Sequence, residues 1–68
     1  MSIISSRIKE LRHENNLTQK QIADVLGCKP YNVGDWERGR VEPDIDTIIA
    51  LAKYFEVTTD YLLGVTEY

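Results

Sequence analysis

The side chains best suited to recognising another molecule gather between Lys29 and Arg40. Asn32 could pair bidentately with adenine, because its amide carries both a donor and an acceptor. Asp35 could accept a hydrogen bond from cytosine N4, and Tyr31 could stack on a base, bond to it or contact only a phosphate. Positive charge for phosphate contact is supplied by Lys29, Arg38 and Arg40. This combination indicates a surface that reads nucleic acid.

Each of these residues also has an ordinary structural interpretation. Asp35 carries the same sign as DNA, so it could equally be a solvated residue kept clear of the bases, and so could any one basic residue alone. Pro30 has no donor, although its ring could pack on a thymine methyl group. Gly34 costs about 1 kcal/mol relative to alanine inside a helix. That cost either permits close approach to DNA or is simply carried at an exposed site.

Two short helices joined by a tight turn are predicted from Thr18 to Gly39. Thr18 opens the first helix with a capping box, completed by Gln21 three residues later. Gly27 can take the left-handed conformation that ends it. A second helix should span Pro30 to Arg38, since proline is favoured at the first helical position. Such a pair forms a helix-turn-helix, whose second helix can lie in the major groove of DNA.

The faces of this second helix follow from its periodicity. Val33 and Trp36 should point toward the core. The outward stripe then consists of Tyr31, Gly34, Asp35 and Arg38. Ahead of this helix, Gln19 stands at the start of the preceding one, where its side chain and the helix-end amides could hold a phosphate oxygen.

Three further helices complete the predicted fold. Apolar residues at helical spacing predict a helix from near Ile4 to Asn15. Asp44 is a good N-cap for another helix, whose apolar stripe comprises Ile45, Ile48, Ile49, Ala52 and Phe55. A last short helix begins after its cap Thr58, and the core is closed by Tyr61, Leu62 and Leu63. With no strand pattern in 68 residues, we expect residues 1–68 to form one all-α domain, a compact bundle of five helices.

The charge of the chain is unevenly distributed. The net charge is −3, yet residues 1–41 carry seven basic and five acidic side chains, whereas residues 42–68 carry one basic and six acidic ones. A local basic face for phosphate contact can therefore coexist with an acidic whole. The expected consequence is weak long-range steering and weak non-specific binding.

Other classes of function find little support in the sequence. Cys28 is the only cysteine, so neither an internal disulfide nor a cysteine-based zinc cluster can form. His13, the only histidine, lies among charged residues with no partners for catalysis or metal binding, and no glycine-rich phosphate loop is present. No enzymatic activity and no cofactor are expected. The lack of a long apolar run or a signal peptide predicts a cytoplasmic protein without a membrane span.

The order and spacing of five sequence words resemble those of the Cro/cI-type (XRE-like) helix-turn-helix family. The words are R-I-K-E-L-R, L-T-Q-K-Q-I-A, V-G-D-W-E-R-G, P-D-I-D-T-I-I-A-L-A-K and V-T-T-D-Y-L-L-G. The opening I-S-S-R is similar to the DNA-binding domain of lambdoid phage repressors, and the match covers roughly Ser5 to Gly64. The resemblance implies sequence-specific binding of a homodimer to double-stranded DNA, at a palindromic operator, usually to repress transcription in bacteria or their phages.

The resemblance also implies roles for individual residues. Its base-contact positions, often filled by amide-bearing residues, are occupied here by Pro30, Tyr31 and Asp35, so this sequence departs from the family pattern. Gln19 matches a position that holds a phosphate. Arg12 and Glu37 match residues that form an internal ion pair, and are therefore expected to be structural.

A competing interpretation is a protein-interaction module that keeps this fold. The acidic C-terminal half and Asp35 favour it, and an antitoxin would combine both activities. For the DNA-binding interpretation, we expect dimerisation on DNA through the region after Val41, with weak or no dimerisation in free solution. The apolar residues there that one small core does not fully cover include Tyr54, Tyr61, Leu63 and Val65.

Overall fold

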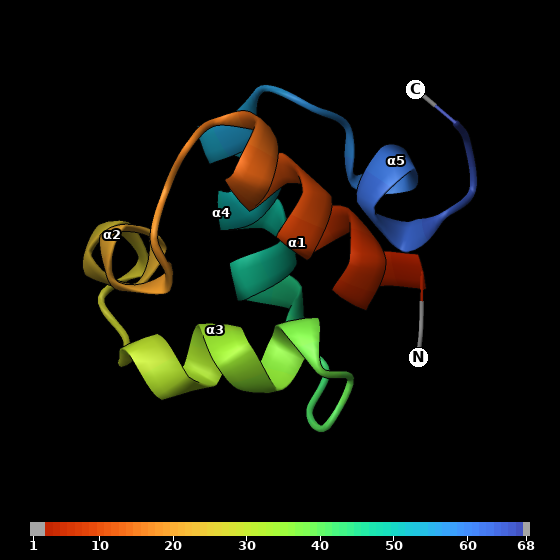
Figure 1. Ribbon diagram of the computed structural model, residues 1–68. Helices are drawn as coiled ribbons and strands as arrows, with labels where there is room; N and C mark the ends of the chain where they lie inside the picture. The colour runs from red at the N-terminus through yellow and green to blue at the C-terminus, as the bar shows by residue number, and fades with distance from the viewer. Residues whose placement is uncertain (1–2, 68) are drawn as a thin grey trace.

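A computed structural model describes residues 3–67 as five α-helices, with no strand among them (Figure 1). The helices are α1 (Ile3–Glu14), α2 (Gln19–Leu26), α3 (Pro30–Glu37), α4 (Ile45–Phe55) and α5 (Thr59–Leu63). The predicted all-α class and the order of the five helices are confirmed. Each predicted boundary lies within one residue of the observed one, because the caps that set these boundaries are local.

The capping residues act as their spacing predicts. Thr18 Oγ1 accepts from the Gln21 amide at 3.1 Å, and Gln21 Oε1 accepts from the Thr18 amide at 2.7 Å, which completes the capping box of α2. Gly27 ends α2 with φ +72°. Asp44 Oδ1 accepts from Thr47 N at 2.8 Å at the start of α4. These hydrogen bonds satisfy amides that a helix start leaves unpaired.

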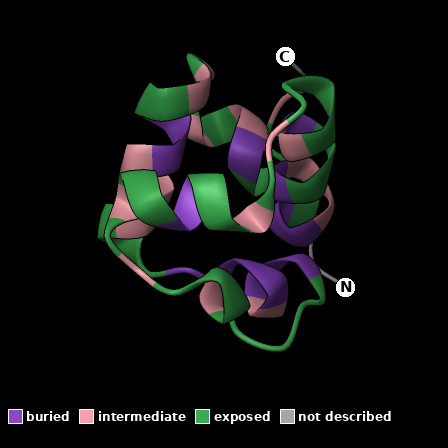
Figure 2. Cartoon of the chain, turned by 60° about the vertical axis from the view of Figure 1, so that its left-hand side comes forward, coloured by how far each residue is buried: buried purple, intermediate pink, exposed green. Residues whose placement is uncertain are grey.

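All five helices contribute to one core, and their buried positions face one another (Figure 2). The most deeply buried large apolar side chains are Ile8, Ile22, Val33, Leu51 and Leu62. Trp36 is 8% exposed, as expected for a core residue of α3. Because α1, α2 and α3 share this core, the hairpin is supported from behind by the first helix.

Two residues of the predicted apolar stripe of α4 are exposed, as is Leu63, a residue expected to help close the core. Ile45 and Ile49 of α4 are 75% and 41% exposed, whereas Leu51 is fully buried. The face of α4 that packs into the core is therefore the one that carries Leu51 and Ala52. Leu63 is 50% exposed. Successive residues of a helix point about 100° apart around its axis. Because Leu62 points into the core from α5, the next residue, Leu63, points away from it.

Arg7 joins the first helix to the last, a role that its sequence position did not indicate. Its Nη1 donates to the carbonyl oxygens of Tyr61 at 2.9 Å and Thr66 at 3.2 Å. The guanidinium also lies 4.0 Å from the centroid of the Tyr61 ring, a cation–π contact. We call these contacts the Arg7 clasp. One of the basic residues counted toward a DNA-facing charge is therefore used inside the fold.

Candidate nucleic-acid interface

Helices α2 and α3 form the hairpin, with α3 at the edge of the molecule. In Figure 1 α2 is seen end-on while α3 runs across the view, so the two helices cross steeply. Helix α3 packs against α2 and α1, and no other described helix lies on its far side in this view. One face of α3 is thus available to a large partner, supported by α1 and α2.

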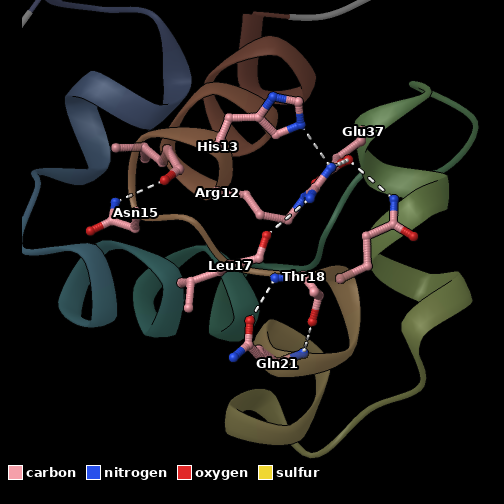
Figure 3. Close-up of polar contacts among 9 residues, drawn as sticks. Arg12, His13, Asn15, Leu17, Thr18, Gln21 and Glu37 are labelled. Carbon is pink, nitrogen blue, oxygen red and sulfur yellow. Dashed lines mark hydrogen bonds and ion pairs between the residues drawn. The ribbon is translucent and has the colours of Figure 1, made fainter.

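Glu37 ties this hairpin to α1 (Figure 3). Arg12 donates from Nε to Glu37 Oε2 at 2.6 Å and from Nη2 to Oε1 at 3.0 Å. Gln19 Nε2 donates to the same Oε1 at 3.2 Å, and Arg12 Nη1 donates to the Leu17 carbonyl at 3.0 Å. The side chain of Glu37 is only 5% exposed. The ion pair implied by the resemblance is present, and it fixes α1, α2 and α3 against one another.

The hydrogen bonds of this ion pair favour the charged form of Arg12. The side-chain hydrogen bond to Glu37 raises the pKa of Arg12 above its ordinary value, and burial acts in the opposite direction with a smaller effect. Charge-assisted, two-point contacts of this kind are among the stronger hydrogen bonds in proteins.

Gln19 is the first residue of α2, but its side chain is not a free arm. It is partly buried, and its amide donates to Glu37. An amide nitrogen carries two N–H donors, so one remains for a phosphate oxygen. The contact with Glu37 links two elements, which is why helix periodicity alone could not reveal it.

Asn32 differs from the expectation of a free base-reading amide. Its Oδ1 accepts from the Lys29 amide at 3.0 Å. Asn32 is the third residue of α3, and its side chain therefore reaches back to the residue before the helix, as Gln21 does in α2. Bidentate pairing with adenine needs both the oxygen and the nitrogen, so the oxygen would have to serve adenine while the Lys29 amide holds its orientation. The same spacing rule that identified Gln21 could have found this cap.

Gly34 is also placed differently from the expectation, because it is buried rather than exposed. A β-carbon added to it would lie 2.9 Å from Arg38 Nη1 and 3.3 Å from Nη2. The Arg38 guanidinium therefore rests on the surface that a side chain at position 34 would occupy. Long helical side chains lean toward the N-terminus, which carries this guanidinium back by one turn.

Asp35 is paired rather than solvated. Its Oδ1 accepts from Arg38 Nη2 at 2.8 Å and lies 3.9 Å from Arg40 Nη1. The side chain of Asp35 is 25% exposed, against 55% for Arg38 and 70% for Arg40. The Asp35 carboxylate thus partly neutralises Arg38 and Arg40, two of the basic side chains expected to contact DNA.

The remaining candidate residues of this face lie at the start of α3. Tyr31 is 66% exposed, and both Lys29 and Pro30 are exposed beside it. The structure therefore brings together Tyr31, Asp35 and Arg38 along one face of α3, with Lys29 and Pro30 at one end. Gln19 is turned toward Glu37 instead.

Residues 3–67 lack the groupings that a metal site or a membrane span requires. No group of three or more His, Cys, Asp or Glu residues there could hold a metal ion. Burial raises the pKa of the Cys28 thiol in the turn between α2 and α3. None of the described helices is long and apolar enough to cross a membrane.

Comparison with known proteins gives consistent matches over nearly the whole chain. A family model described as helix-turn-helix matches residues 8–62. The transcriptional regulator ImmR of Bacillus subtilis is 39% identical over 64 residues, which are 94% of this chain and 50% of ImmR. Repressor protein C2 of Salmonella phage P22 is 28% identical over 61 residues, 90% of this chain and 28% of the repressor. The chain thus spans about half the length of ImmR, and less of the phage repressor.

Solved structures agree with these matches. The crystal structure of the P22 c2 repressor in complex with a synthetic operator has a TM-score of 0.87 at 26% identity, covering 97% of this chain and 100% of that one. A transcriptional regulator from Listeria innocua has a TM-score of 0.88 at 31% identity, covering 96% of this chain and 61% of that one.

Proposed function

Because the chain belongs to the Cro/cI-type (XRE-like) helix-turn-helix family, we propose that it is the DNA-binding part of a bacterial or phage transcriptional regulator, a repressor. It binds specific sequences of double-stranded DNA with α3 in the major groove. The observation that carries this proposal is the fit, over 97% of the chain, to a phage repressor solved in complex with operator DNA. The chain acts by binding alone, without catalysis or cofactor, in the cytoplasm where bacterial DNA lies.

The fixed position of α3 supports this function physically. A major groove admits one α-helix, and reading it requires the helix to keep its orientation against the phosphate backbone. The ion pair of Arg12 with the 5%-exposed Glu37 holds α3 to α1, while Gln19 adds α2 to the same carboxylate. The hairpin therefore meets DNA as one rigid unit.

The polar and basic residues of the hairpin and its flanks divide between phosphates and bases in this proposal. Lys29 and Arg40 contact phosphates, as does Gln19 through its second N–H. Tyr31 and Pro30 lie in the first turn of α3, where recognition helices approach the base edges most closely. Asn32 contributes its amide N–H group while its oxygen holds the cap.

Dimerisation on a palindromic operator completes the proposal, since one recognition helix covers few base pairs. The exposed apolar residues after position 41 that a second copy would cover are Ile45, Ile49, Tyr54, Leu63 and Val65. Tyr61, which the sequence placed in this group, is partly buried under the Arg7 guanidinium.

Selection of bound duplexes from a random DNA pool tests the function directly. We expect a palindromic consensus whose half-site centres are about 10 base pairs apart, and binding that weakens steeply with salt. The absence of any enriched sequence, together with binding that is insensitive to salt, would contradict the proposal and favour a protein-interaction module.

A further inference from the structure

Two residues of α3, Gly34 and Asp35, and its C-cap Arg38 form a unit that the proposed function does not yet use. Gly34 lacks a side chain, the Arg38 guanidinium lies on the vacant space, and Asp35 Oδ1 accepts from Arg38 Nη2 at 2.8 Å. We call the two ion-paired side chains the Asp35–Arg38 pair, and Gly34 is the residue over which the guanidinium lies. The pair lies at the middle of α3, on the same outward stripe as the exposed Tyr31.

The groups that the pair leaves unused match one base pair. Arginine has five N–H donors, of which the contact with Asp35 engages Nη2, and Asp35 Oδ2 has no hydrogen bond within the described residues. In the major groove a G·C pair presents the acceptors N7 and O6 of guanine next to the N4 donor of cytosine. An A·T pair presents no two adjacent acceptors beside a donor, and it adds the thymine methyl group.

Resting on the proposed function, we propose that the Asp35–Arg38 pair reads a single G·C base pair in each half-site. Arg38 donates to guanine N7 and O6, and Asp35 accepts from cytosine N4 of the same base pair. The acid on the reading face, unfavourable near DNA when alone, is thereby the part of the unit that completes the match.

The position of the Arg38 guanidinium favours base reading over phosphate contact. A guanidinium that serves a phosphate extends from the flank of the helix, but this one is drawn back to the level of Gly34. The ion pair also holds it in one orientation before DNA arrives, which reduces the entropy lost on binding. Arg40 offers the contrast, because it lies beyond the end of α3, is 70% exposed and approaches Asp35 only to 3.9 Å.

The test measures affinities of the wild-type chain and of variants for the selected operator and for operators changed at one base pair each. Asp35→Asn, Arg38→Lys and Gly34→Ala should each lower discrimination at one G·C position on the order of tenfold, with the other positions unchanged. Arg40→Ala is the matched control and should weaken every operator by the same factor. The atoms nearest to an alanine β-carbon at position 34 belong to the movable end of Arg38, so we expect this variant to fold, and a melting temperature no lower than that of the wild type will confirm it.

Two outcomes would overturn the inference. One is a selected consensus without a G·C pair opposite α3. The other is a uniform effect of Asp35→Asn and Arg38→Lys on all operators, as for Arg40→Ala, which would mark Arg38 as a phosphate contact. Both outcomes leave a sequence-specific protein, whereas a wild-type chain that enriches no sequence contradicts the proposed function itself.

Discussion

Replacing Arg12 with alanine should be among the most destabilising single changes in this domain. The Glu37 side chain is only 5% exposed in the wild-type chain. The variant removes both hydrogen bonds from Arg12 to the Glu37 carboxylate, so that Gln19 is the remaining side-chain donor. Breaking a buried ion pair by removing one partner costs about 3 to 5 kcal/mol. At about 0.05 to 0.15 kcal/mol per residue, the whole domain is stable by only about 3 to 10 kcal/mol. We therefore expect Arg12→Ala to melt at least about 12 °C lower, or to be unfolded at room temperature.

Thermal and urea denaturation followed by circular dichroism would measure this loss, with Lys20→Ala as the control. Lys20 pairs with Asp24 at 2.9 Å, but their side chains are 73% and 63% exposed, so its removal should cost less than about 0.5 kcal/mol. The double variant Arg12→Met, Glu37→Met removes both charges and should recover much of the stability. Equal melting temperatures for Arg12→Ala and Lys20→Ala would refute the reasoning, as would a double variant no more stable than Arg12→Ala.

Three further predictions follow from the structure. Gly34→Ala should stabilise the fold by about 0.5 kcal/mol, because the gain in helix propensity exceeds the loss of one exposed ion pair, whereas Gly27→Ala, at φ +72°, should destabilise it by about 1 kcal/mol in the same urea titration. Hydrogen bonds from Thr47 lower the pKa of Asp44, so they stabilise the fold fully above the ordinary aspartate pKa, and this stabilisation is lost as the pH falls through the lowered pKa. In Asp44→Asn the melting temperature should therefore depend less on pH below about pH 4 than in the wild type. An unchanged pH dependence in this range would contradict the prediction. Sedimentation with a palindromic operator should give two chains per duplex, and a complex of one chain with one duplex would exclude the dimer.

The sequence predicted the helices well because their ends depend on neighbouring residues. Thr18, Gly27 and Asp44 each act within four residues of themselves, so their roles follow from spacing alone. The Arg12–Glu37 pair lies 25 residues apart in the chain, and only the resemblance to a family implied it.

The candidate interface was less predictable, since its side chains are occupied by partners within the fold. Asn32 was assigned to adenine although capping geometry turns its oxygen to Lys29. Periodicity placed Gly34 on the outward stripe, but it could not show that Arg38 folds back over Gly34, which is buried. Whether a side chain is available to contact a DNA base depends on its rotamer and on its neighbours in space, and the linear sequence pattern does not contain this information.

The Arg7 clasp has a consequence for the order in which the domain folds. Its two hydrogen bonds join residues 54 and 59 positions apart, whereas Glu37 and Arg12 are 25 apart. Each doubling of loop length adds about 0.6 kcal/mol of closure entropy, so we expect the clasp to form after α1, α2 and α3 have assembled. Contacts absent from the folding transition state act on the unfolding rate alone. We therefore expect the clasp to slow unfolding, and in stopped-flow measurements Arg7→Ala should unfold faster while refolding at the wild-type rate.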